Sequence, residues 1–120
     1  MKIIFYQLIF FTTILFAADS TKISFSRDIF PILNKKCMPC HAEEEENKSE
    51  FFMDDYKKII KGGKSGVAII PGKSVKSNFI VKLYPNPPAG KQMPMMTKKK
   101  LDDSTISILK RWIDEGAKNN

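Results

Sequence analysis

The sequence predicts an all-α domain of short helices joined by long irregular loops. No segment alternates between apolar and polar residues as a half-buried strand does, whereas about four segments carry apolar residues at helical spacing. Glycine and proline punctuate the stretches between these segments. The chain has 120 residues, which is enough for one domain with a modest core.

The N-terminal segment has the layout of a secretory signal peptide. Lys2 precedes an apolar run from Ile3 to Phe16, and Ala17 and Ala18 supply small residues for cleavage after either of them. A retained membrane anchor is the alternative, but this run is about fifteen residues long and a spanning helix needs roughly twenty. The segment therefore predicts an exported, periplasmic protein with no stable membrane span after cleavage.

The first helix is expected to begin near Asp28, as its N-cap, and to run into the segment CMPCH. Pro31 fits only the first turn of this helix, where its missing N–H needs no partner. The predicted apolar face comprises Ile29, Phe30, Ile32 and Leu33.

A polar loop precedes the second helix. The run Glu43–Glu46 predicts a solvated surface, and Asn47-Lys48-Ser49 matches a glycosylation sequon that matters only in a eukaryotic secretory host. The second helix is expected to end at Gly62-Gly63. Its apolar face is predicted to hold Phe52, Tyr56, Ile59 and Ile60.

Two more helices are predicted nearer the C-terminus. Ser74 or Ser77 is expected to cap a short helix with inward-facing Phe79, Ile80 and Leu83. Asp102 or Asp103 is expected to cap the last and clearest helix, whose inward face comprises Ile106, Ile108, Leu109, Trp112, Ile113 and Gly116. The segment between them, PNPPAGKQMPMMTKKK, is rich in proline and is expected to be a loop.

The segment CMPCH holds both cysteines and the only histidine of the chain. C-x-x-C-H is the attachment signature of c-type haem. The two thiols add across the two vinyl groups on one edge of the porphyrin and form thioethers, and two intervening residues let one helical turn span that edge. The motif predicts one covalent haem c on Cys37 and Cys40, with His41 as the proximal iron ligand.

Other interpretations of the two cysteines stay open at this point. A zinc site needs three or four protein ligands, and only carboxylates could complete it here. A redox dithiol would accompany a βαβ pattern, which the sequence lacks. A single disulfide with an incidental histidine is the third alternative. The export signal favours haem, because cytochrome c maturation takes place outside the cytoplasm.

A second axial ligand for the iron must come from elsewhere in the chain. With no second histidine, the natural donor is methionine, and Met/His ligation raises the reduction potential and suits electron transfer. The proline-rich loop supplies Met93, followed by Pro94, and two competitors, Met95 and Met96. We expect Met93 to bind the iron, with an open sixth position as the alternative.

Four stretches carry a resemblance to a known family: FSRDIFPILNKKCMPCH, GGKSGVAIIPGKSVKSNFI, MPMM and LDDSTISILKRWIDEGA. They are similar to a planctomycete-type cytochrome c domain, a branch of the monohaem cytochrome c fold. The resemblance implies a small cytochrome c-like fold around one haem, held by Cys37, Cys40, His41 and Met93. Met95 stands where the family usually has a second proline.

The resemblance also sets the predicted domain boundaries and one structural role. It covers the range 25–117 and leaves a signal peptide (1–17), an N-terminal extension (18–24) and a C-terminal tail (118–120). Trp112 falls where the family has an aromatic residue that packs the last helix on the first, so its role is expected to be structural.

The sequence thus predicts an exported monohaem cytochrome that carries single electrons between redox partners and is not an enzyme. The alternatives are a five-coordinate haem protein acting as a gas sensor or peroxidase-like enzyme, and a non-haem secreted binding module. The net charge of +7 and the run Lys98–Lys100 favour acidic redox partners, with the chain a monomer or a small subunit of a respiratory complex. Nucleic acid is not an expected partner, because no nucleic-acid motif is present.

Overall fold

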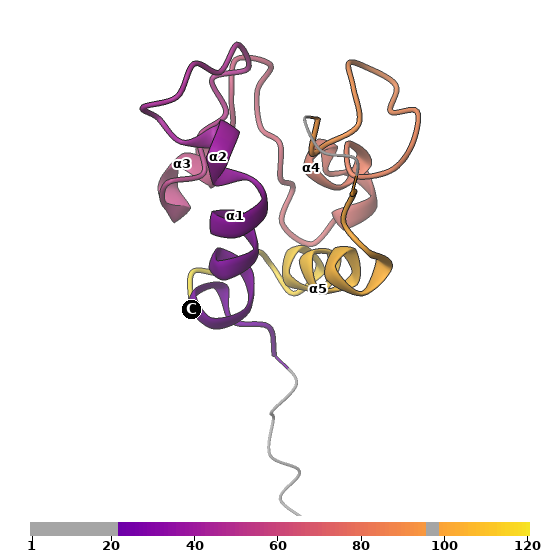
Figure 1. Cartoon of the computed structure of the whole chain (residues 1–120). Coiled ribbons are helices and arrows are strands. Elements are labelled where there is room, and N and C mark those ends of the chain that lie inside the picture. The colour runs from indigo at the N-terminus through magenta and orange to yellow at the C-terminus, as the bar shows by residue number, and fades with distance from the viewer. Residues whose placement is uncertain (1–21, 96–98) are drawn as a thin grey trace, which may run out of the picture.

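The computed structural model describes residues 22–95 and 99–120. The predicted signal peptide, and the predictions for Met96 and Lys98, fall outside these residues. Figure 1 shows five α-helices: α1 (Phe30–Lys36), α2 (Met38–His41), α3 (Tyr56–Lys61), α4 (Asn78–Val81) and α5 (Asp103–Asp114). A π-helical turn (Phe25–Ile29) precedes α1, and a 3₁₀ turn (Ser74–Lys76) precedes α4.

The all-α prediction is confirmed for the described ranges. Their only strand-like pairing is an isolated bridge between Gly63 and Gly66. In the same ranges, no helix combines the length and the apolar character that crossing a bilayer requires.

The first helical segment begins earlier than predicted. Ser24, not Asp28, is its N-cap: the Ser24 Oγ accepts a hydrogen bond from the Arg27 N–H at 3.2 Å. Asp28 instead accepts a hydrogen bond from the Ser24 N–H at 2.8 Å. The physical reason is burial, because Phe25 and Ile29 both lie in the core and are four residues apart on one helical face.

The α-helical segment α1 begins at Phe30, directly after the π-helical turn. Pro31 therefore lies in the first turn of α1, as predicted. Within the predicted apolar face, Ile29 and Leu33 are buried, and Phe30 and Ile32 pack partly buried against the core.

The Asp28 carboxylate gives this turn a pH-dependent stability. Its hydrogen bond to the Arg27 side chain, with that to the Ser24 N–H, lowers the pKa of Asp28 from 3.8 to about 2. The stabilisation is complete above the unfolded-state pKa and is lost as pH falls toward the folded-state value. We expect Asp28→Asn to lower the melting temperature near neutral pH, and the difference from wild type to vanish toward pH 2. Thermal melts by circular dichroism across this range test the prediction; a difference that persists unchanged at low pH would contradict it.

The three remaining helical segments broadly match their predictions. Asp55 caps α3, which ends at Gly62 with a positive φ of 83°, although Phe52 lies outside the helix. Ser77 precedes α4, and the inward-facing Phe79, Ile80 and Leu83 are all buried. Asp102 caps α5 by accepting a hydrogen bond from the Thr105 N–H at 2.7 Å. The buried face of α5 comprises Ile106, Leu109, Trp112 and Ile113.

An aromatic cluster around Phe25 joins the first and last helices. The Phe25 ring lies 5.8 Å from that of Phe30, 5.4 Å from that of Tyr56 and 5.5 Å from that of Trp112, measured between centroids. The Trp112 side chain is 1% exposed, and its indole N–H donates to the Lys118 carbonyl at 2.9 Å. This packing of α5 against the start of the first helix is the structural role predicted for Trp112.

Removal of this indole should strongly destabilise the fold. We expect Trp112→Ala to lower the free energy of unfolding by about 3–5 kcal/mol, because it leaves a large buried cavity and an unpaired carbonyl. The control Val75→Ala, at a side chain that is 71% exposed, should change it by less than about 0.5 kcal/mol. Denaturant titration of both variants, matched in cofactor content, gives the two values; equal values would contradict this role of Trp112.

Hydrogen bonds join the two ends of the described chain. The Asn120 backbone carbonyl accepts hydrogen bonds from the Ser26 N–H at 3.0 Å and from the Ser24 hydroxyl at 2.9 Å. The Asn120 side-chain oxygen accepts a hydrogen bond from the Phe25 N–H at 2.9 Å. Figure 1 shows the C-terminus beside the start of the first helical segment, in agreement with these bonds.

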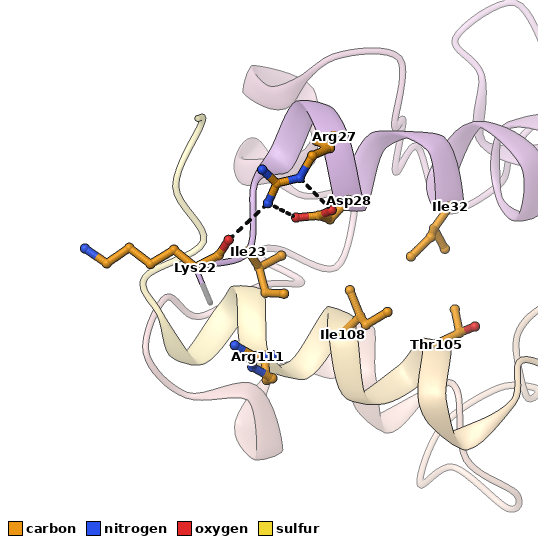
Figure 2. Close-up of a pocket in the computed structure, with 8 residues that line it drawn as sticks. All are labelled: Lys22, Ile23, Arg27, Asp28, Ile32, Thr105, Ile108 and Arg111. Carbon is orange, nitrogen blue, oxygen red and sulfur yellow. Dashed lines mark hydrogen bonds and ion pairs between the residues drawn. The ribbon is translucent and has the colours of Figure 1, made fainter. Parts of the chain in front are cut away.

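A surface hollow of about 610 Å³ lies between the first helical turn and α5 (Figure 2). An ion pair of Arg27 and Asp28, with 2.8 Å between Nη2 and Oδ2, lies on one side of it. The lining residues are Lys22, Ile23, Arg27, Asp28, Ile32, Thr105, Ile108 and Arg111. This set contains no cysteine, histidine or methionine, so the predicted ligands lie elsewhere in the fold.

Candidate functional site

The CMPCH segment forms a single helical turn directly after α1. The Cys37 N–H donates to the Leu33 carbonyl at 2.8 Å, which continues the hydrogen-bond pattern of α1. The Cys37 carbonyl in turn accepts from the Cys40 N–H at 3.1 Å and from the His41 N–H at 2.9 Å. The two cysteines predicted to attach haem and the histidine predicted to bind its iron are therefore carried on one turn, as the spacing predicts.

The two thiols of this turn have different surroundings. Both are free; Cys40 is exposed, whereas Cys37 packs partly buried against the core. Burial, with a smaller effect of the neighbouring Cys40, raises the pKa of the Cys37 thiol from 9.0 to about 12. The raised pKa keeps the Cys37 thiol protonated near neutral pH.

The His41 ring is held by backbone groups of the following loop. Its Nδ1 lies 2.7 Å from the Phe51 carbonyl oxygen, and the His41 carbonyl accepts a hydrogen bond from the Met53 N–H at 2.8 Å. The Phe51 ring also contacts the imidazole edge-on, with centroids 5.8 Å apart. Because a carbonyl can only accept, a proton on Nδ1 satisfies this contact and leaves the lone pair of Nε2 for a metal.

Met93 lies in the loop after α4. Its backbone N–H donates to the Lys82 carbonyl at 2.7 Å, which ties the loop to the C-terminal end of α4. The Met93 side chain is partly buried against the core, whereas Met95 is 49% exposed. The Lys100 Nζ donates to the Pro94 carbonyl next to Met93, so this lysine of the predicted basic run contacts the methionine loop itself.

The structure places His41 and Met93 on separate elements, and an aromatic pair connects His41 to α4. Figure 1 shows α2 and α4 both in its upper half, with α5 below α4. The His41 ring contacts Phe51, and Phe51 contacts Phe79 of α4 edge-on at 6.5 Å between centroids. Cys37, Cys40 and His41 are thus brought together on one turn, whereas Met93 lies in a separate loop that is bonded to the end of α4.

The donor chemistry of these residues fits a c-type haem. Two free thiols share one turn with a histidine whose Nδ1 is engaged, which is the arrangement expected of a metal-binding imidazole. Among the residues described, no three His, Cys, Asp or Glu side chains lie close enough together to hold a metal ion, so the zinc interpretation gains no support.

Sequence reasoning missed two contributors to this site. The Phe51 carbonyl is a backbone group, and nothing in the residue type indicates that it would meet His41. Asn47 places its side-chain nitrogen 2.7 Å from the His41 Nδ1. The Asn-x-Ser pattern gave one indication that Asn47 shapes this loop, since an asparagine side chain often hydrogen-bonds the backbone two residues ahead.

Comparisons with known proteins identify the family of this chain. A family model described as planctomycete cytochrome c matches residues 37–96, a range that includes both CMPCH and the MPMM segment. The fold is similar to a chain of the solved Kuenenia stuttgartiensis hydrazine synthase, with a TM-score of 0.53 and 24% identity over 80% of this chain. The match spans only 16% of that chain, so the likeness concerns the fold alone. No curated protein matches significantly. From the family match over half of its length, the chain belongs to the planctomycete cytochrome c family.

Proposed function

We propose that this protein is an exported monohaem c-type cytochrome that carries single electrons between redox proteins. The observation that carries the proposal is the turn of α2, where Cys37, Cys40 and His41 lie together and the Phe51 carbonyl engages the His41 Nδ1. Membership of a cytochrome c family supports a haem protein and, in general terms, electron transfer.

In this proposal each residue of the turn has a separate task. Cys37 and Cys40 would hold the haem through thioether bonds, and His41 would bind the iron through Nε2. The bound haem supplies an iron that accepts and releases one electron. The Phe51 carbonyl keeps the His41 ring in one tautomer, so that Nε2 is the ligand.

Met93 is the residue that would bind the iron together with His41. Its partly buried side chain and the bond from its N–H to α4 give it a defined position, whereas Met95 is about half exposed. A thioether sulfur paired with an imidazole raises the reduction potential of haem iron and suits a carrier. This assignment carries the family's distal methionine over to the present loop.

The proposed partners are redox proteins with acidic docking surfaces. Lys35 and Lys36 are exposed in the last turn of α1, directly before Cys37, so positive charge lies next to the proposed attachment site. With the net charge of +7, this arrangement favours electrostatic steering onto an acidic partner. Periplasmic export is proposed from the N-terminal segment and is consistent with the family.

A haem stain with an optical spectrum of the same sample tests this function. The chain is expressed in a bacterial host with cytochrome c maturation, purified and run on a denaturing gel. We expect a stained band at the size of the chain and a low-spin spectrum with methionine ligation. A colourless band would overturn the haem proposal in favour of a non-haem binding module. High-spin iron in the wild type would overturn the carrier in favour of a five-coordinate sensor or peroxidase-like enzyme.

A further inference from the structure

The Asn47-Lys48-Ser49 segment has no part in the proposed function, yet its first side chain reaches the proximal histidine. The Asn47 Nδ2 lies 2.7 Å from the His41 Nδ1, 3.1 Å from the Phe51 carbonyl oxygen and 3.3 Å from the Cys40 carbonyl oxygen. One amide group therefore contacts the histidine, its hydrogen-bond acceptor and the second cysteine.

Ser49 determines which way the Asn47 amide faces. The Asn47 Oδ1 accepts hydrogen bonds from the Ser49 N–H at 3.0 Å and from the Ser49 hydroxyl at 2.5 Å. A backbone N–H can only donate, so the atom facing Ser49 must be the oxygen. The NH₂ group of Asn47 consequently faces His41.

The protons at this site can be assigned one by one. The NH₂ group of Asn47 has two hydrogens, and two carbonyl oxygens, those of Cys40 and Phe51, lie within hydrogen-bond distance of it. With Nε2 taken by the iron, the imidazole proton is on Nδ1 and is donated to the same Phe51 carbonyl, 2.7 Å away. The 2.7 Å contact between the Asn47 Nδ2 and the His41 Nδ1 then joins two donors and is not a hydrogen bond. Because two donors share this carbonyl, it draws less on the Nδ1 proton than an undivided acceptor would. The imidazole is then a less basic ligand, which favours the reduced state of the iron.

The loop that carries Asn47 is supported from behind. The Ser49 carbonyl accepts a hydrogen bond from the Lys64 N–H at 2.7 Å, and the Ser49 hydroxyl accepts one from the Phe51 N–H at 3.3 Å. Gly63 allows this close approach, because a Cβ there would lie 2.5 Å from the Ser49 oxygen. The segment that follows α3 therefore supports the loop that carries Asn47, which limits the freedom of the amide to turn away from His41.

We propose that Asn47, oriented by Ser49, is a positioning residue that limits rotation of the His41 ring and, by sharing the Phe51 carbonyl with the Nδ1–H, moderates electron donation by the imidazole to the iron. This inference rests on the proposed function, since it assigns a role toward an iron bound at Nε2. It gives the Asn-x-Ser segment a task in tuning the reduction potential.

The first test replaces Asn47 with aspartate. In Asn47→Asp, a carboxylate oxygen takes the place of the NH₂ group and accepts the Nδ1 proton directly, so the imidazole becomes a stronger donor. We expect the reduction potential to fall by about 59 mV, which for one electron corresponds to a tenfold change in the equilibrium constant of electron transfer. The matched control is Asn34→Asp, which adds the same charge on the exposed face of α1. Redox titration of both proteins measures the two shifts.

The second test removes the amide without adding charge. Asn47→Ala should broaden or split the low-spin electron paramagnetic resonance signal of the oxidised protein, because the ring is then free to adopt more than one orientation. The control Asn78→Ala, at an exposed residue of α4, should leave that signal unchanged. The alanine variant also keeps the inference testable should the aspartate variant fold poorly.

The outcomes separate this inference from the proposed function. A wild-type protein without haem stain refutes the function itself. With haem present in all four variants, equal potential shifts in Asn47→Asp and Asn34→Asp would reduce the effect to distant charge and overturn the positioning role. An unchanged signal in Asn47→Ala would overturn it as well.

Discussion

Replacing both Cys37 and Cys40 with alanine is expected to abolish the haem stain on a denaturing gel completely. Thioether bonds survive denaturation, whereas a haem held only by iron ligands is lost with the fold. The two thiols lie on one helical turn, and no other cysteine exists in the chain to replace them. The double variant should therefore give a colourless band of unchanged size.

This double variant should also be poorly folded. A domain of this size has a modest core, and a covalently bound macrocycle adds a large apolar surface to it. We expect reduced helical signal and no cooperative thermal transition by circular dichroism. The control Pro39→Ala lies in the same turn, is exposed and lacks sulfur, so it should retain the stain. A stained band from the double variant, or an unstained one from the control, would contradict thioether attachment at these two positions.

Replacing Met93 with alanine is expected to remove the second axial ligand while leaving the haem attached. The oxidised protein should lose the weak red absorption typical of sulfur-ligated haem iron and become high-spin. Because a thioether sulfur favours reduced iron, the reduction potential should fall by on the order of 0.1 V or more, within the ~0.8 V span that axial ligands set. Optical spectra and a redox titration of the stained protein measure both effects.

Two matched variants locate the ligand within the methionine-rich segment. Met95→Ala changes a side chain that is 49% exposed, and Met53→Leu changes one that is only 4% exposed in the core. Both should keep the red absorption. Loss of this absorption in Met95→Ala but not in Met93→Ala would move the ligand two residues along the chain; loss in Met96→Ala alone would assign it to Met96.

Where α5, α3 and α4 would form could be read from the sequence because local signals agree there. The apolar face of α5, its cap Asp102 and the glycine that ends α3 depend only on nearby residues. The start of the first helix was predicted one turn too late. Asp28 has the chemistry of an N-cap, but its carboxylate bonds to the Arg27 side chain and the Ser24 N–H instead. Burial of Phe25 among aromatic residues of α3 and α5 extends the helix toward the N-terminus.

The sequence by itself determined that two thiols and a histidine share one turn, because the spacing of C-x-x-C-H is a property of the local chain. It also determined the all-α class through helical periodicity. Only the tertiary structure decided which nitrogen of His41 is engaged, and that Asn47 shares the Phe51 carbonyl with it. The physical reason is that a backbone carbonyl is the same group in every residue. Its partner is set by the path of the chain through space and not by the residue that carries it.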